Sequence, residues 1–199
     1  MEFALLFKDE ATMEKYSWMA FGKGKSRLVI IHLNKPQESG LGGFVRSSMF
    51  NDIPIVVDSS SEDERDYDFA CLAAAKNGVV PRVKMTEEIF YGIKRNEPIA
   101  RFTLLHEIGH HINRDLRNKD FTAETYDENR VAAVKQGRVL NFELRADAFA
   151  CLYLGLDYSI KALEQLKAYG DETEQGKLFI SEIELRIQAL HRLIKFWKL

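Results

Sequence analysis

Several features that define other classes of protein are scarce in this sequence or missing from it. Its 199 residues include only 2 cysteines, Cys71 and Cys151, which lie far apart and form no C-x-x-C pair, so a disulfide scaffold is not indicated. No apolar run approaches the roughly 18 residues that a membrane span requires. The formal net charge is −2, which gives no overall attraction to nucleic acid or to an anionic membrane.

Targeting and repeat signals are missing as well. Asp9, Glu10 and Glu14 come too early for a secretory signal. There is no internal repeat, low-complexity segment or long Ser/Gly linker, and the length fits one domain of about 100–200 residues. We therefore expect a single domain, 1–199, in a cytoplasmic protein that binds neither nucleic acid nor membrane directly. The oligomeric state is left open.

The first half of the chain predicts a small sheet. Two apolar runs rich in β-branched residues, 28–33 and 53–57, predict strands. A further strand is expected at 79–85, where Pro81 would confine it to a sheet edge or to irregular structure. The glycines at 39–43 predict a loop. Capping residues at the start and glycines at the end predict two helices, one from Asp9 to just before Gly22 and one from Ser61 to Lys76.

The second half of the chain predicts helices. Pro98 suits the first turn of a helix, and Phe102, Leu105, Gly109 and Ile112 follow it at helical spacing. Further helices are expected at 141–154, 159–169 and 177–197, and a short one before Gly137 after a polar, loop-rich stretch at 114–129. Because few strands come first and many helices follow, the predicted fold class is α+β, with a small sheet in the N-terminal half.

The segment 101–113, RFTLLHEIGHHIN, contains an H-E-x-x-H motif. Residues four apart in a helix lie on the same face, so His106 and His110 can direct two imidazoles to one metal ion. Glu107 lies one step round the helix, where its carboxylate can reach an attacking water without binding the metal. Chance alone produces this motif in about one chain per hundred of this composition, so its position on a predicted helix adds weight.

Two histidines do not complete a catalytic zinc site, which usually takes three protein ligands and a water. The segment 141–150, NFELRADAFA, predicts a second helix with Glu143 and Asp147 on one face beside an apolar seam. Carboxylates buried at such a seam need a compensating cation, which a metal ion would provide. Glu124 and Glu128, in the intervening polar segment, compete with Glu143 for the role of third ligand.

RFTLLHEIGHHI followed by E-x-x-A-D-x-F-A resembles the ImmA/IrrE-like zinc metallopeptidases of the Glu-zincin group. The resemblance implies a zincin-like fold, Zn²⁺ as cofactor, His106, His110 and Glu143 as its ligands, and Glu107 as the catalytic base. It also implies that Asp147 supports a zinc-bound imidazole. The resemblance covers two helices, within an active-site core of about 53–158 that a C-terminal helical extension, 159–199, follows. The helix-turn-helix that often accompanies such peptidases has no counterpart here.

We therefore predict a zinc metallopeptidase that acts on a protein or peptide substrate, with a narrow intracellular target such as a regulator. The alternatives are a zinc-binding regulatory or interaction protein with little or no proteolytic activity, and a structural zinc module. Glu107 favours the enzyme, because a closed structural site has no use for a base beside the metal.

The remaining histidines and tyrosines leave one role open. Tyr126, Tyr153 and His191 are all candidates for stabilising an oxyanion, and the sequence does not choose among them. His32, in an apolar strand, and His191 are expected to be hydrogen-bonded structural residues. His111 follows His110 directly and faces about 100° away, so we expect it on the surface or behind the ligands.

Overall fold

The computed structural model describes residues 16–21, 28–35, 40–47, 53–57, 70–73, 82–115 and 126–197 of the chain. Six strands of the described residues form one sheet in the order β1-β2-β3-β4-β6-β5. The strands are β1 (Tyr16–Phe21), β2 (Leu28–Leu33), β3 (Leu41–Ser47), β4 (Ile53–Val57), β5 (Ala70–Ala73) and β6 (Arg82–Met85). All neighbouring strands run antiparallel except β4 and β6, which are parallel.

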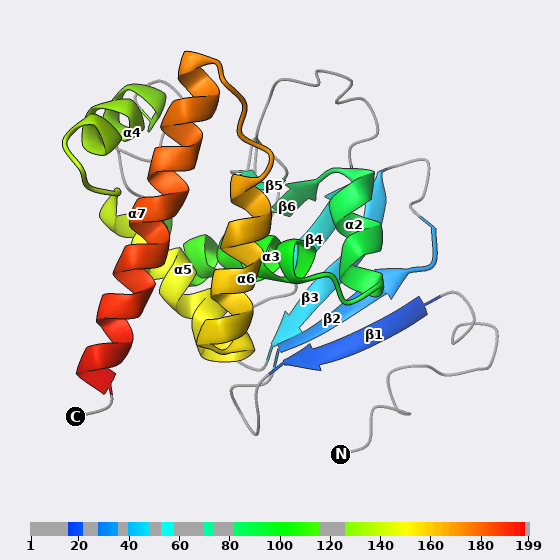
Figure 1. The fold of residues 1–199 in the computed structure, drawn as a ribbon. Helices are drawn as coiled ribbons and strands as arrows, with labels where there is room; N and C mark the ends of the chain where they lie inside the picture. Colours follow the sequence, from blue (N-terminus) through cyan, green and yellow to red (C-terminus); the bar gives the residue numbers. More distant parts are fainter. Residues whose placement is uncertain are drawn as a thin grey trace.

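Six helices follow the described strands: α2 (Glu87–Lys94), α3 (Pro98–Ile112), α4 (Tyr126–Lys135), α5 (Asn141–Leu154), α6 (Leu156–Lys167) and α7 (Glu174–Trp197). The sheet lies on one side of the molecule and α4 and α7 lie farthest from it, with α3, α5 and α6 between (Figure 1). This arrangement confirms the predicted α+β class, with the sheet in the N-terminal half. None of the described helices combines the length and the apolarity that a bilayer crossing needs.

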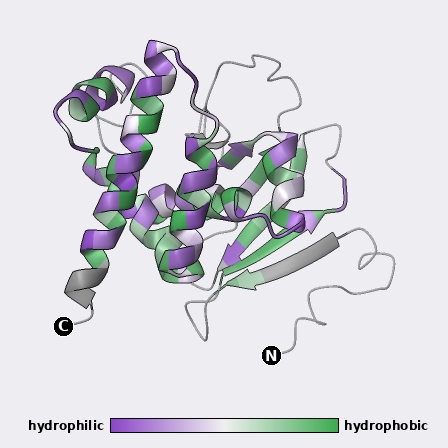
Figure 2. Cartoon of the chain, in the orientation of Figure 1, coloured by the Kyte–Doolittle hydropathy of each residue, from purple (hydrophilic) through white to green (hydrophobic). Residues whose placement is uncertain are grey.

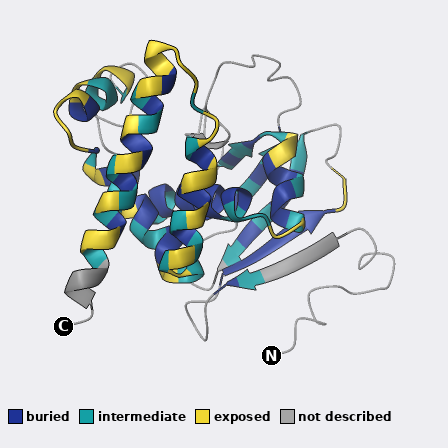
Figure 3. Ribbon diagram, viewed as in Figure 1, coloured by how far each residue is buried: buried dark blue, intermediate teal, exposed yellow. Residues whose placement is uncertain are grey.

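The core lies between the sheet and the helices. Apolar side chains of the inner strands pack against those of α2 and α3, and the apolar colours of Figure 2 run along the strands and the inner helix faces. Helix α3 lies at the centre, and every residue from Phe102 to His110 is buried (Figure 3). A helix buried on all sides is normally apolar all round, so the charged and polar side chains that α3 carries there require partners.

Two segments predicted as helices contain strands. Residues 16–21 form β1, paired with β2 along its whole length, and residues 70–73 form β5, paired with β6. The rest of both predicted helices lies outside the described residues. The alanines of β5 favour helix locally, but the hydrogen-bond ladder with β6 outweighs that preference, because strand formation depends on the partner strand.

Two further predictions about the sheet were wrong. The expected loop at 39–43 is largely β3, where a Cβ on Gly42 would lie 2.8 Å from the Phe90 ring of α2. The glycine there allows the close approach of a helix to the strand. Strand β6 is not at an edge but lies between β4 and β5, and Pro81 lies outside the described residues. None of the residues Arg82–Met85 is a proline, so each has an amide N–H for the ladders on its two sides.

The predicted helix 141–154 is confirmed residue for residue by α5, and the helix predicted from Pro98 through Ile112 by its spacing is α3, which has Pro98 at its first position. Helix α6 begins at Leu156 and α7 at Glu174, each three residues earlier than expected. The short helix before Gly137 is α4. The sequence reading did not find α2, although Thr86 caps it by accepting a hydrogen bond from the Ile89 amide and Glu87 and Glu88 occupy its first turn.

His32 on β2 is buried as expected but lacks the expected hydrogen bonds. Its side chain faces the Phe90 ring edge-on at 5.6 Å, and neither ring nitrogen has a hydrogen-bond partner among the residues that the structure describes. Burial, with a smaller contribution from the charge of Lys94, lowers the pKa of His32 from 6.5 to about 4. The folded protein therefore holds this imidazole neutral over a pH range in which the unfolded chain protonates it.

Replacing His32 should change how stability depends on pH. Because the folded pKa lies below the unfolded one, wild-type stability falls as pH drops from about 6.5 to 4. The shift corresponds to a loss of about 3 kcal/mol at most. His32→Leu removes this loss. The difference between the unfolding free energy of the variant and that of the wild type should therefore shift in favour of the variant as pH falls from 7 to 4. Urea titrations at both pH values measure the difference, and parallel pH profiles of the two proteins would contradict the explanation.

Candidate metal centre

The two histidines of the H-E-x-x-H motif face each other one turn apart on α3. Their rings are perpendicular, with centroids 4.6 Å apart, and the Nε2 atoms of His106 and His110 lie 3.0 Å from each other. Both side chains are buried. The helical spacing that predicted a shared face is thus borne out by the structure, and the two Nε2 atoms point at one place.

Glu143 of α5 supplies a carboxylate to the same place. Its Oε2 lies 3.1 Å from His106 Nε2 and its Oε1 lies 3.5 Å from His110 Nε2. Of the two competing acids, Glu128 is exposed on α4 and Glu124 lies outside the described residues. The structure therefore brings Glu143 to the histidines and leaves Glu128 in solvent.

A close crossing of α3 and α5 positions this carboxylate. A Cβ built on Gly109 would lie 2.9 Å from the Cα and 3.1 Å from the carbonyl oxygen of Ala146, so only glycine fits there. The crossing lies between His106 and His110 on one helix and beside Glu143 on the other. Small residues at the crossing thus bring side chains of the two helices within ligand distance of each other.

Each histidine also contacts an aspartate through its other ring nitrogen. His106 Nδ1 lies 2.8 Å from Asp147 Oδ1, and His110 Nδ1 lies 3.0 Å from Asp115 Oδ2. An ionised carboxylate only accepts hydrogen bonds, so Nδ1–H is the donor in both pairs. In a neutral imidazole Nε2 then carries the lone pair. When both rings are neutral, two lone pairs and the Glu143 carboxylate converge, which is the arrangement that binds a metal ion.

The distances among these atoms are close to those of a tetrahedral metal site, and two of the three are somewhat shorter. With metal–ligand bonds of about 2.0–2.2 Å, ligand atoms of such a site lie roughly 3.3–3.6 Å apart. The three separations here are 3.0, 3.1 and 3.5 Å. Glu107 belongs to the same buried group, because the ligand atoms of His106, Glu107 and His110 all lie within 4.8 Å of one another. This group does not include Glu143. The structure therefore shows that His106, Glu107 and His110 could hold a metal ion, and it places Glu143 as a further carboxylate against both histidines.

The surroundings of the cluster favour positive charge at its centre. Burial and the Arg186 guanidinium lower the pKa of His106, but hydrogen bonds to Asp147 and Glu143 outweigh both and raise it to about 10. Burial raises the pKa of Glu143, whereas His106 and His110 lower it by more, so that this carboxylate stays ionised. A cation between these groups would satisfy the same electrostatic demand.

Two arginines behind the aspartates were missed by the sequence reading. Arg186 of α7 contacts both carboxylate oxygens of Asp147, and Arg145 of α5 lies 2.5 Å from Asp115 Oδ1. Asp115 itself, just after α3, was also missed. Arg186 comes from the region that the sequence analysis described as a helical extension, 159–199. The sequence does hold one signal for Arg186, because it is a charged residue within the apolar stripe of the helix predicted at 177–197.

Helix α4 covers another side of the cluster. The Tyr126 hydroxyl donates a hydrogen bond of 3.0 Å to Glu143 Oε1, and Arg130 Nε lies 2.6 Å from Glu182 Oε2 of α7. Burial and the Glu143 charge raise the pKa of Tyr126, which keeps its hydroxyl protonated. Of the three oxyanion candidates, Tyr126 is the one beside the cluster, because His191 is exposed on α7 and Tyr153 packs on Phe149.

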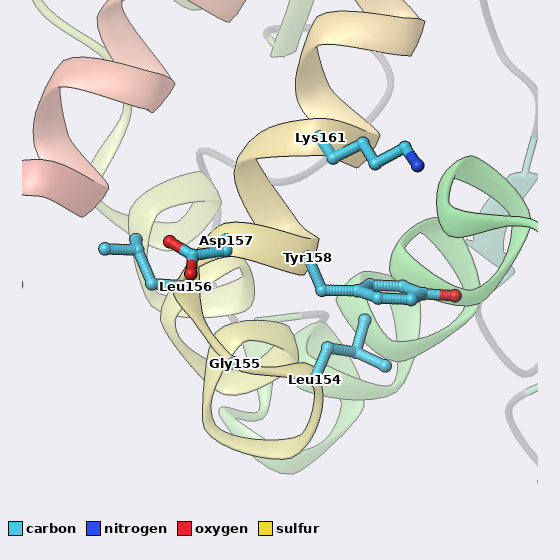
Figure 4. Close-up of a pocket in the computed structure, with 6 residues that line it drawn as sticks. All are labelled: Leu154, Gly155, Leu156, Asp157, Tyr158 and Lys161. Carbon is cyan, nitrogen blue, oxygen red and sulfur yellow. The ribbon is translucent and has the colours of Figure 1, made fainter.

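An open pocket at the junction of α5 and α6 lies apart from this cluster. It is lined by Leu154, Gly155, Leu156, Asp157, Tyr158 and Lys161, and none of the cluster residues contributes to it. Figure 4 shows Tyr158 and Lys161 extending to one side of α6 while Asp157 and Leu156 point to the other. Because its charged groups do not converge, this pocket offers no comparable chemistry.

Metal binding should depend on Glu143 and not on Glu128. Removing a ligand weakens a three-ligand site, whereas Glu128 is exposed on α4 and serves as the matched control. Titration calorimetry with Zn²⁺ should show that Glu143→Ala loses most of the affinity of the wild type and that Glu128→Ala keeps it. The reverse order would exclude Glu143 as the third ligand.

The helix crossing should tolerate no side chain at Gly109. A methyl group there would meet the backbone of Ala146, so the helices must move apart and the ligand distances grow. We expect Gly109→Ala to lose about 1–3 kcal/mol of unfolding free energy and to bind Zn²⁺ more weakly. Adding Ala146→Gly should not restore binding, because the obstructing atoms belong to the backbone. Wild-type affinity in Gly109→Ala would contradict this account of the crossing.

Comparisons with protein-family models, with curated proteins and with solved structures gave no match to this chain. The interpretation of the cluster therefore depends on the residues and the geometry described above.

Proposed function

We propose that this protein is a zinc-dependent metallopeptidase, with His106, His110 and Glu143 as metal ligands and Glu107 as the general base. The observation that carries the proposal is the buried convergence of two imidazole Nε2 atoms and the Glu143 carboxylate, with Glu107 beside them. The resemblance of both helices to ImmA/IrrE-like peptidases, and a zincin-like fold, are part of the same proposal. The proposed substrate is a protein or peptide inside the cell.

The donor set favours zinc over the other common divalent ions. Ca²⁺ and Mg²⁺ prefer oxygen ligands throughout, whereas two imidazoles with one carboxylate are an established catalytic zinc set. Three protein ligands leave a fourth position for water or substrate. A structural site would instead use a fourth protein ligand, commonly a cysteine, and the buried Cys151 has no contact with the histidines among the described interactions.

The second carboxylate separates an enzyme from a binding protein. Zinc bound here would lower the pKa of a water molecule toward 7 and polarise a substrate carbonyl. Glu107 would accept the proton of the attacking water and pass it to the leaving amine. Asp147 and Asp115 keep Nδ1 of each histidine protonated, so that Nε2 remains available as a ligand. Tyr126, whose hydroxyl donates to Glu143, would stabilise the oxyanion in this proposal.

The alternative function is zinc binding for regulation or interaction with little or no proteolysis. It shares the metal ligands and differs only in having no task for Glu107. Both functions therefore predict metal in the purified protein, and only the peptidase predicts that changing Glu107 abolishes an activity while the metal stays.

Glu107→Gln should separate these functions. The amide keeps the shape of the side chain but cannot accept the proton, so fold and zinc content should survive. Cleavage should fall by about 10²–10⁴-fold. The assay is mass spectrometry of a proteome-derived peptide library, followed by co-expression with proteins encoded nearby. Glu164→Gln, an exposed change on α6, is the matched control and should cleave like the wild type. Equal cleavage by Glu107→Gln would refute the peptidase mechanism.

A further inference from the structure

Behind each histidine of the cluster stands a chain of two further residues. One chain runs from His106 Nδ1 to Asp147 Oδ1 at 2.8 Å and from Asp147 to Arg186. The other runs from His110 Nδ1 to Asp115 Oδ2 at 3.0 Å and from Asp115 to Arg145. Both therefore have the order histidine, aspartate, arginine, and both end on a permanent positive charge.

The two arginines differ in burial and in geometry. The Arg186 side chain is 11% exposed and uses two nitrogens, with Nε 2.8 Å from Asp147 Oδ2 and Nη2 2.5 Å from Asp147 Oδ1. The Arg145 side chain is 54% exposed and reaches Asp115 Oδ1 with Nη2 alone. A guanidinium held by two parallel hydrogen bonds fixes the plane of its carboxylate, which a single exposed contact does not.

Packing of α7 alone gives no reason for a guanidinium at position 186. The residue lies on the buried stripe of that helix, between the core residues Ile183 and Leu190. An apolar side chain there would fill the seam without the desolvation cost that a buried ion pair carries. What Arg186 adds is control of Asp147, whose Oδ1 both accepts from Arg186 and contacts His106. Arg186 Nη2 also lies 3.2 Å from His106 Nδ1, so all three side chains meet at one point.

We propose that Arg186 is a positioning residue of the metal centre. It holds the Asp147 carboxylate in the plane that keeps Oδ1 on His106 Nδ1, and thereby fixes the ring of His106 with Nε2 toward the metal position. The C-terminal helix α7 is then part of the metal centre. The inference rests on the proposed metal site but not on peptide cleavage, so metal binding tests it separately.

The test is Zn²⁺ affinity, measured by competition with a chromogenic chelator, together with the visible spectrum of bound Co²⁺. The variants are Arg186→Met, Arg186→Lys, Asp147→Asn and the double variant Asp147→Asn/Arg186→Met, with Arg145→Met as matched control. Losing a partner of a metal ligand costs about 10–100-fold in affinity, and we expect about 10-fold for Arg186→Met. Arg186→Lys keeps the positive charge but lacks the planar guanidinium. Its Zn²⁺ affinity should therefore lie between that of Arg186→Met and that of the wild type.

A role exerted through Asp147 predicts a specific combination of results. The double variant should bind Zn²⁺ no more weakly than Asp147→Asn alone, because Arg186 has nothing left to position. Arg145→Met should lose less than about 3-fold, because its exposed contact constrains Asp115 weakly. The Co²⁺ spectrum should change in Arg186→Met and stay unchanged in Arg145→Met. A purely structural role would lower the melting temperature and leave both the spectrum and the affinity unchanged.

The outcomes separate this inference from the proposed function. Wild-type Zn²⁺ affinity in Arg186→Lys and Arg186→Met, or losses that add in the double variant, would overturn the positioning role. If Arg186→Met does not fold, Arg186→Lys and the charge-free double variant decide the question by the same criteria. A wild-type protein that binds Zn²⁺ and shows the predicted losses but cleaves no peptide would support Arg186 and refute the peptidase. A wild-type protein that binds neither Zn²⁺ nor Co²⁺ would overturn both.

Discussion

The crossing of α3 and α5 leaves no room for a side chain between Gly109 and Ala146, and the remaining features of the cluster depend on this approach. Because the backbones are so close, a carboxylate from one helix reaches two imidazoles of the other without a long side chain. The same closeness removes water from these groups, so their charges become costly unless each has a partner. Burial and the need for opposite charge are thus consequences of a single packing contact.

Each charged group of the cluster is paired with an opposite charge farther from the centre. Imidazoles contact aspartates, aspartates contact arginines, and the outermost arginine on one side is half exposed whereas the other is buried on α7. Buried ion pairs seldom increase stability over apolar packing, so stability alone gives no reason for these pairs. Helix α4 extends the pattern, since Tyr126 donates to Glu143 and Arg130 pairs with Glu182.

The parts of this structure that were predictable from sequence are those set by local periodicity. His106 and His110 share a face because they are four apart on a helix, and the same spacing groups Glu143 with Asp147. Asp115 and Arg186 could not be found in this way, since their partners lie on other segments and only the fold brings them together. Strand β5 was missed for a related reason, because its alanines favour helix and its ladder depends on β6. Strand β1 was missed although Tyr16, Trp18 and Phe21 favour a strand.

The position of Arg186 in the chain has a consequence for biosynthesis. It lies 80 residues after His106 in sequence, and both histidines and Glu143 leave the ribosome before it does. A domain generally folds as a unit, and α7 contributes Phe179, Ile183 and Leu190 to the same core as α3, so the core is not complete before α7 has been made. Asp147 then lacks its counter-charge until the last helix docks. The helix that completes the core is thus also the helix that brings Arg186 to Asp147, so the packing of the core and the final geometry of the cluster arise together.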